Sequence, residues 1–448
     1  MNNEKTADIL WEHVSYPISE RISGRVSDGA GDGLSDCAAR AVITTMVLVL
    51  VFFITPAPAE TGHAFEKPYF AADYLLTRVS ASGAEDPDPL HNNRFIKVLV
   101  ASSKTSFFID NGHFNGFEYE FLSAYETFIN RVVDRYYRIK VLFIPVALKD
   151  IFYFLEKGYG DIAAAGSSFS EHRSEQFSFS RPYVWNADNI MVRERQKGKQ
   201  PAVHPGGNIT LAVRRENTKL LDTLNRFIEK NRKGSHLGNI LYNRYYRNSR
   251  WVKNPHLYHA MDPFPGVFKF MKLYGAQYQL NPLLLLAVAY KESRLEQANT
   301  SPKGAVGIMQ LMPGTAACSS VGIKNIHDLE NNIHAGVKYL YHLKTQYFDH
   351  SAISREDRFF LTLAAYNAGP ERIMKMRRIT QKNGGNPDKW FFNVEKTAAQ
   401  MIGQEVVEYV ADVYKYFIAY KLQADLIKNR NTVSRNQSQD FRYRFSVR

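Results

Sequence analysis

Two cysteines in 448 residues are too few for a disulfide framework. Cys37 and Cys318 lie on opposite sides of the single long apolar run of the chain. If this run enters a membrane the two thiols do not meet, so we expect no disulfide. The sequence also lacks a Cys/His cluster with zinc spacing. We therefore expect neither a metal nor a cofactor.

The sequence also has no glycine-rich loop that could cradle phosphates, and no basic run interleaved with stacking aromatic residues. Nucleic acid is therefore not expected as a partner, although the formal net charge is +13. A basic surface favours anionic partners in general, including acidic lipid and acidic cell-wall polymer. The length of 448 residues predicts two or three domains.

The apolar run covers residues 41–54 and is followed by Ala57-Pro58-Ala59. Its 14 residues suit a secretory signal better than a full membrane span, but the preceding polar stretch is long for a signal. We expect a disordered tail at 1–40, a signal sequence or membrane anchor at 41–59 and a linker at 60–93. This segment therefore predicts export from the cytoplasm, with attachment to the membrane if it is not cleaved.

Residues 94–250 alternate between strand-like and helix-like patterns. Short apolar and β-branched runs predict strands at 95–100, 141–146 and 161–165. Helical periodicity predicts helices at 117–133 and 148–157 between them. This alternation indicates an α/β unit with a parallel sheet.

Three segments of this unit resemble the first lobe of the periplasmic amino-acid-binding proteins. They are residues 116–121 (GFEYEF), residues 160–166 (GDIAAAG), and Arg173 with the following 179–183 (FSRPY). In that family a strand-end loop and an arginine hold the carboxylate of an amino acid. The resemblance places this role at Gly166, Ser168 and Arg173, and a guanidinium fork with a hydroxyl suits a carboxylate.

The chain departs from that family after residue 192. Where a second lobe should follow, only a Gly/Pro/Lys-rich stretch reaches Gly207. Residues 209–213 and 218–230 then resemble the return strand and a closing helix. The second lobe is thus largely missing, and one lobe cannot enclose a small ligand. We expect residues 94–250 to serve as a scaffold or a partner contact, with retained ligand binding as the alternative.

A buried helix is predicted to begin at Asn281-Pro282, because Asn is a good N-cap and Pro suits the first helical position. Residues 283–290 are apolar on nearly every face. Glu292 follows at the end of this helix, where desolvation raises the pKa of a carboxyl and keeps it protonated near neutral pH. A general acid requires this property. Glu296 lies among polar residues and should be solvated.

Three further segments follow in the helical region. Residues 304–313 form a Gly-punctuated apolar loop that carries Gln310. Residues 358–366 form an apolar helix that ends at Asn367, before Gly and Pro. Residues 405–422 form an amphipathic helix that carries Tyr409.

These elements in this order resemble the family 1 lytic transglycosylases, the group of the soluble lytic transglycosylase and goose-type lysozyme. The matching strings are Glu292-Ser293, residues 307–310 (GIMQ), residues 365–367 (AYN) and Tyr409 within residues 406–410 (VVEYV). The resemblance implies an all-α lysozyme-like domain at 261–428, followed by a basic tail at 429–448. The predicted fold class is α+β multidomain, with a periplasmic-binding-protein-like lobe before this domain.

The resemblance also implies an activity, namely cleavage of the β-1,4 bond between N-acetylmuramic acid and N-acetylglucosamine in peptidoglycan strands. Glu292 would act first as acid and then as base on the 6-hydroxyl, leaving a 1,6-anhydromuramyl end. One carboxyl suffices because the 2-acetamido group stabilises the oxocarbenium-like state. The implied substrate-binding residues are Ser293, Gly307, Met309, Gln310, Tyr366, Asn367 and Tyr409.

More specific roles follow from the same resemblance. Ser293 and Gln310 are expected near the acetamido group. Met309 is expected either in the groove wall or in the core, since methionine commonly fills gaps. Tyr409 and Asn367 are expected to hold Glu292 or the sugar.

Two alternatives stay open. One is a hydrolytic lysozyme, whose product has a reducing end. The other is a sensor or anchor that binds peptidoglycan or an amino acid and has an idle enzyme domain.

Overall fold

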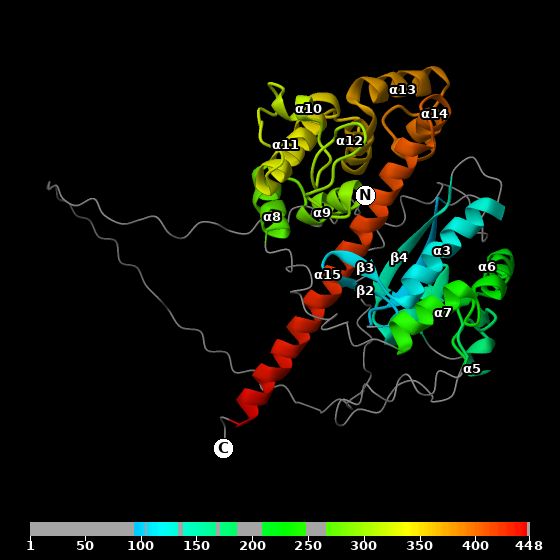
Figure 1. Cartoon of the computed structure of the whole chain (residues 1–448). Helices are drawn as coiled ribbons and strands as arrows, with labels where there is room; N and C mark the ends of the chain where they lie inside the picture. The colour runs from blue at the N-terminus through cyan, green and yellow to red at the C-terminus, as the bar shows by residue number, and fades with distance from the viewer. Residues whose placement is uncertain are drawn as a thin grey trace, which may run out of the picture. The chain divides into compact units, whose positions relative to one another are not determined.

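The computed structural model describes residues 94–103, 105–132, 138–166, 171–185, 208–247 and 266–445 (Figure 1). The predictions for the tail at 1–40, the apolar segment at 41–59, the linker at 60–93 and Ser168 lie outside the described residues. Within the described part, none of the helices combines the length and the apolar character that a membrane span requires.

A five-stranded sheet forms the centre of the first domain. Its order is β4 (Lys140–Val146), β1 (Phe95–Ala101), β5 (Ile162–Ala164), β7 (Ala212–Arg214) and β6 (Phe177–Phe179). Strand β1 pairs in parallel with both β4 and β5, whereas β7 is antiparallel to β5 and β6. The predicted parallel sheet is therefore confirmed for three strands, and the return strand makes the sheet mixed. A short hairpin joins β2 (Phe108–Asp110) to β3 (His113–Asn115).

Helices accompany this sheet much as the periodicity predicts. They are α3 (Phe117–Val132), the short turn η1 (Leu148–Asp150), α4 (Ile151–Glu156), α5 (Glu171–Ser174), α6 (Thr218–Asn231), α7 (His236–Tyr242) and η4 (Asn243–Arg247). The hydroxyl groups of Tyr125 on α3 and Thr223 on α6 lie 2.6 Å apart, and both residues are buried. The return strand and its helix thus close a single lobe.

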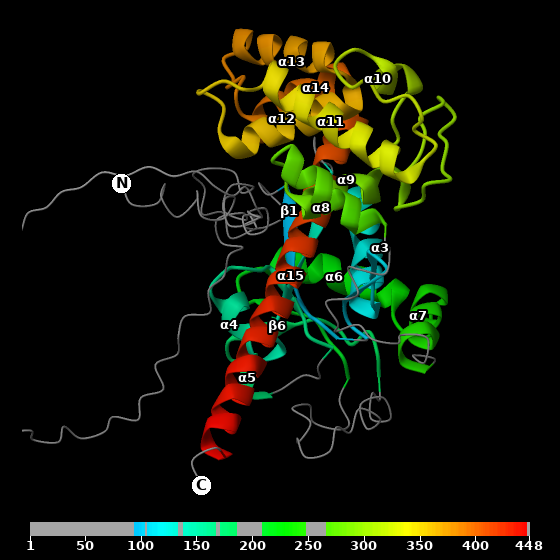
Figure 2. The same ribbon diagram turned by 90° about the vertical axis from the view of Figure 1, so that its left-hand side faces the viewer.

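The second domain is helical, as predicted. It contains α8 (Val267–Gln277), α9 (Pro282–Ser293), α10 (Pro313–Ala317), α11 (Leu329–Tyr347), α12 (Arg355–Ala368), α13 (Pro370–Lys382), η7 (Trp390–Val394), α14 (Glu395–Met401) and α15 (Gln404–Phe445). Figure 2 shows α11, α12 and α13 gathered near the N-terminal end of α15.

Helix α9 begins as its sequence predicts. The Asn281 side chain accepts a hydrogen bond of 2.9 Å from the Leu283 amide, and Pro282 occupies the first turn. Every residue from 284 to 290 is buried, so the helix runs through the core of its domain. Arg294 ends the helix in the left-handed conformation, with φ of 58°. Glu292 therefore lies in the last turn of a buried helix.

Helix α15 differs from its prediction in two respects, namely where it ends and how it is buried. It continues to Phe445, beyond the predicted end at residue 422 and into the segment 429–448 that the sequence assigns to a basic tail. It is also not amphipathic, because residues 406–420 are almost all buried. The reason is that α15 has two partners, since it packs against β4 of the first domain and against α9 of the second (Figures 1 and 2).

An aromatic cluster reinforces this junction. Phe114 of the β2–β3 hairpin lies 5.3 Å from Tyr290 of α9, measured between ring centroids. The same ring lies 5.5 Å from Tyr416 and 4.6 Å from Tyr420 of α15. These four side chains are buried, so apolar packing as well as chain connectivity joins the two domains.

Candidate active site

Glu292 lies in the last turn of α9 and faces α15. The Tyr409 hydroxyl donates a hydrogen bond of 2.6 Å to Glu292 Oε1. The glutamate side chain is half-buried. Burial raises its pKa from 4.5 to about 7, against the Tyr409 hydrogen bond and the Lys291 charge, which both act to lower it. Glu292 is thus protonated in a large fraction of molecules near neutral pH, as its position in the sequence predicts.

Two tyrosines accompany this carboxyl. Tyr409 is buried, and burial together with the Glu292 charge holds its pKa well above 10. Tyr366 of α12 has a similarly raised pKa, with burial first and the Glu292 charge second among the causes. The Tyr366 hydroxyl donates to the Met309 carbonyl at 2.7 Å. Both phenols therefore keep their protons, and Tyr409 serves Glu292 as a hydrogen-bond donor.

Ser293 braces the end of α9. Its buried hydroxyl lies 2.9 Å from the Ile308 carbonyl oxygen and 3.2 Å from that of Ala289. It also accepts a hydrogen bond from the Glu296 amide at 3.2 Å. These contacts tie the C-terminal end of α9, which carries Glu292, to the 304–313 loop. Direct contact between Ser293 and a sugar stays a prediction.

The 304–313 loop turns back on itself, with an antiparallel bridge between Val306 and Leu311. Gly307 has φ of 80°, and a Cβ there would lie 2.3 Å from the Asn332 side-chain nitrogen. Asn332 is completely buried on α11; it accepts from the Met309 amide at 2.9 Å and donates to the Val306 carbonyl at 2.9 Å. Glycine is therefore required at 307 so that the loop can close on this amide.

Sequence reasoning did not identify Asn332. The available signal was a polar amide on the otherwise apolar face of the helix at 329–347, next to Ile333. Because a buried amide must be hydrogen-bonded, such a residue marks a backbone segment that it holds in place.

Two neighbouring residues of the 304–313 loop, Met309 and Gln310, differ in exposure. Met309 is completely buried against Gly336 of α11, so of its two predicted places it takes the core and not the groove wall. The loop turns this side chain into the core, where methionine commonly fills gaps. Gln310 is partly exposed, and its side-chain nitrogen donates to the Gly307 carbonyl at 2.9 Å. Contact of Gln310 with the acetamido group stays a prediction.

Asn367 lies at the end of α12, as predicted, but its side chain is exposed. Among the described residues it has no hydrogen-bond partner, so the expectation that it holds Glu292 is wrong for this structure. An exposed amide at a helix end is instead available to solvent or substrate. Its contact with a sugar stays a prediction.

The predicted carboxylate cradle of the first domain is partly described. Gly166 has φ of 60°, and a Cβ there would lie 2.9 Å from the Ser106 hydroxyl and 3.4 Å from Glu118 Oε1. The Arg173 guanidinium lies over the Phe152 ring, 4.0 Å from its centroid. Arg173 is thus stacked on an aromatic ring of its own domain, and ligand binding at this place stays a prediction. Across the described ranges, no group of three or more His, Cys, Asp or Glu side chains could hold a metal ion.

Two family models match this chain. The transglycosylase SLT domain matches residues 270–389, and the bacterial extracellular solute-binding proteins, family 3, match residues 96–248. Within the described residues, the second match corresponds to the lobe built on the five-stranded sheet.

The similar proteins include several lytic transglycosylases. Membrane-bound lytic murein transglycosylase F of Pseudomonas syringae pv. syringae (strain B728a) is 28% identical over 54% of this chain and 50% of that protein. The protein of the same name from Pseudomonas putida (strain W619) is 25% identical over 83% of this chain and 72% of its own length. The 70 kDa soluble lytic transglycosylase of Escherichia coli is 25% identical over 41% of this chain and 27% of that chain, with a TM-score of 0.29.

The chain spans about half the length of several curated relatives that it matches. It nevertheless contains both kinds of domain in the described part, with Glu292, Gly307 and Tyr366 inside the SLT match and Tyr409 on the helix that follows. The chain thus carries a family 3 solute-binding domain followed by a transglycosylase SLT domain, and is similar in this arrangement to membrane-bound lytic murein transglycosylase F.

Proposed function

We propose that this protein is a lytic transglycosylase of peptidoglycan and that Glu292 is its acid and base. One observation carries the proposal, namely a half-buried carboxyl with a pKa of about 7 and a tyrosine donor at 2.6 Å. A general acid works best when its pKa lies near the working pH. The match of the surrounding residues to the SLT domain supports the same function.

The first step is protonation of the glycosidic oxygen by Glu292. The bond from C1 of N-acetylmuramic acid to this oxygen then breaks, and the N-acetylglucosamine portion leaves with the proton. The Tyr409 hydroxyl and the Lys291 charge favour the ionised form of Glu292, so they stabilise the carboxylate as it forms. The 2-acetamido group of the sugar stabilises the positive charge at C1.

The second step closes the anhydro ring. The Glu292 carboxylate takes the proton of the 6-hydroxyl, whose oxygen bonds to C1. The glutamate is protonated again, and no water is consumed. Ordinary glycosidases use two carboxyls about 5 to 9.5 Å apart. Glu296, one turn further on, is exposed and its amide is bonded to Ser293, so we assign it no chemical role.

The proposed location is the periplasmic side of the cell envelope, where peptidoglycan lies. The relatives are named membrane-bound, and residues 41–59 could supply either a signal or an anchor. We propose that residues 94–250 act as a scaffold for the enzyme domain. Their packing on α15 supports this role.

The test is a digest of purified sacculi by the full chain and by Glu292→Gln, with mass spectrometry of the products. We expect 1,6-anhydromuramyl ends from the wild type and none from the variant. Glu296→Gln is the matched control, because it removes an exposed carboxyl one turn away. Products heavier by one water would indicate a lysozyme. Undigested sacculi with folded wild-type protein, or full activity of Glu292→Gln, would contradict the proposal.

A further inference from the structure

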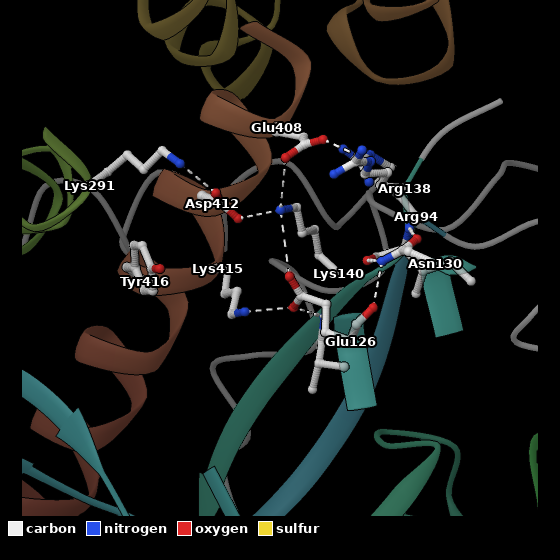
Figure 3. A network of polar contacts seen from close by, with 12 residues as sticks. Arg94, Glu126, Asn130, Arg138, Lys140, Lys291, Glu408, Asp412, Lys415 and Tyr416 are labelled. Atoms are coloured by element: carbon white, nitrogen blue, oxygen red, sulfur yellow. Dashed lines mark hydrogen bonds and ion pairs between the residues drawn. The ribbon is translucent and has the colours of Figure 1, made fainter. Parts of the chain in front are cut away.

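A chain of ion pairs connects the sheet of the first domain to the end of α9 (Figure 3). Lys140 of β4 extends its ammonium to Asp412 of α15, with Nζ 2.8 Å from Oδ1. The other oxygen of Asp412 accepts a hydrogen bond of 2.7 Å from Lys291 Nζ. Asp412 thus bridges two lysines that come from different domains.

Further charges surround this bridge. Glu126 of α3 lies 3.5 Å from Lys140 and 2.7 Å from Lys415, again between ammonium nitrogen and carboxylate oxygen. Glu408 of α15 lies 3.7 Å from Lys140. Each ammonium of the network, from Lys140, Lys291 and Lys415, therefore has at least one carboxylate partner.

The side chains at the centre of this network are largely shielded from solvent. The Lys140, Asp412 and Lys415 side chains are 8%, 11% and 7% exposed. Burial acts to raise the pKa of Asp412, but the charges of Lys140, Lys291 and Lys415 outweigh it and hold this pKa below its usual range. In such surroundings a carboxylate is fixed by its partners, because their loss would leave a buried charge uncompensated.

Both residues of the Lys291–Asp412 ion pair lie next to residues of the candidate active site. Lys291 immediately precedes Glu292 on α9. Asp412 follows Tyr409 by one turn of α15, and Tyr409 is the residue that donates to Glu292. The Lys291–Asp412 bond therefore cross-links the two helices that carry the Glu292–Tyr409 hydrogen bond.

We propose that Asp412 is a positioning residue for Glu292, and that Lys140 of the solute-binding domain holds Asp412 in place. The truncated lobe is then a structural part of the catalytic unit. This inference rests on the proposed function of Glu292. It extends that function, because it assigns a role in the reaction to a residue of β4 far from the SLT match.

Because Asp412 and its lysine partners are charged, replacing them should change the pKa of Glu292. The groups that face Glu292 are Lys291 on its own helix, Tyr409 on α15 and Tyr366 on α12. Asp412→Asn leaves the Lys291 ammonium without its carboxylate, which favours ionised Glu292 and lowers its pKa. Lys140→Met removes a positive charge and should therefore raise the pKa of Glu292.

The experiment compares the full chain with Asp412→Asn and Lys140→Met. The control is Asp425→Asn, which breaks a pair formed within α15 itself, with Lys421 Nζ 2.8 Å from Asp425. We measure kcat and KM on soluble glycan strands from pH 5 to 9. The NMR titration of Glu292 in the same variants is read independently of activity.

We expect kcat to fall about tenfold in both variants with KM within about twofold, because small misplacements of a catalytic group cost much rate. The alkaline limb of the pH profile of kcat and the NMR midpoint of Glu292 should both shift by about 0.5 pH unit. The shift should be to lower pH in Asp412→Asn and to higher pH in Lys140→Met. The control Asp425→Asn should have the kcat, the KM and the Glu292 titration of the wild type. Unchanged kcat, or shifts of the same sign in both variants, would overturn the proposal.

If Asp412→Asn does not fold, the kcat and the Glu292 titration of Lys140→Met test the proposal. Inactive wild-type protein would refute the proposed function instead, and the opposite shifts of the Glu292 titration would still test the positioning.

Discussion

Replacement of Glu292 by glutamine should change stability in a way that depends on pH. The pKa of Glu292 is raised by burial from 4.5 to about 7. A carboxyl with a raised folded-state pKa contributes stability that is fully present below pH 4.5 and is lost as the pH rises through about 7. At about 1.4 kcal/mol per pKa unit this loss is about 3 kcal/mol at most, and partial exposure reduces it.

Glutamine keeps the size and the acceptor oxygen but cannot ionise. The free energy of unfolding of Glu292→Gln should therefore equal that of the wild type at pH 4.5 and exceed it by about 1–3 kcal/mol at pH 8.5. Urea unfolding followed by circular dichroism at the two pH values measures this difference.

The control is Glu296→Gln, which removes an exposed carboxyl one turn away from Glu292. A Glu292→Gln variant with the same relative stability at both pH values would refute the desolvation argument. So would a variant that is less stable than the wild type at pH 8.5.

Three other substitutions test separate contacts. Tyr409→Phe removes a bond that lowers the pKa of Glu292, so the alkaline limb of activity should move to higher pH while kcat falls about tenfold. Gly307→Ala should lower the free energy of unfolding by about 2 kcal/mol or more in urea, since a Cβ there lies 2.3 Å from a buried amide. Arg94→Met leaves buried Glu395 without its ion-pair partner at 2.9 Å and should cost roughly 3–5 kcal/mol in the same assay.

Local patterns were sufficient for the helix that carries the candidate acid. Asn281 and Pro282 define the start of α9, and the apolar run that follows predicts its burial. The raised pKa of Glu292 follows from that burial alone. The predicted role of Tyr409, in contrast, rests on the resemblance to a known family, because no local pattern predicts that a tyrosine contacts a carboxyl distant in the sequence.

Long-range packing limits what the sequence can predict. A helix buried by two domains, such as α15, cannot be distinguished by its periodicity from one that closes a single domain. Lys140 and Asp412 look like solvated surface charges, since most Lys and Asp residues are exposed. Their pairing depends on the packing of β4 against α15, which no local pattern specifies.

The most direct test is the titration of the Glu292 carboxyl in the full chain. Selective ¹³C labelling of glutamate side chains, with Glu292→Gln to assign the resonance, gives this pKa by NMR. We predict a midpoint near pH 7, because burial raises the pKa of Glu292 more than the Tyr409 hydrogen bond and the Lys291 charge lower it. A midpoint near 4.5, the value of an ordinary glutamate, would contradict the assignment of Glu292 as the acid.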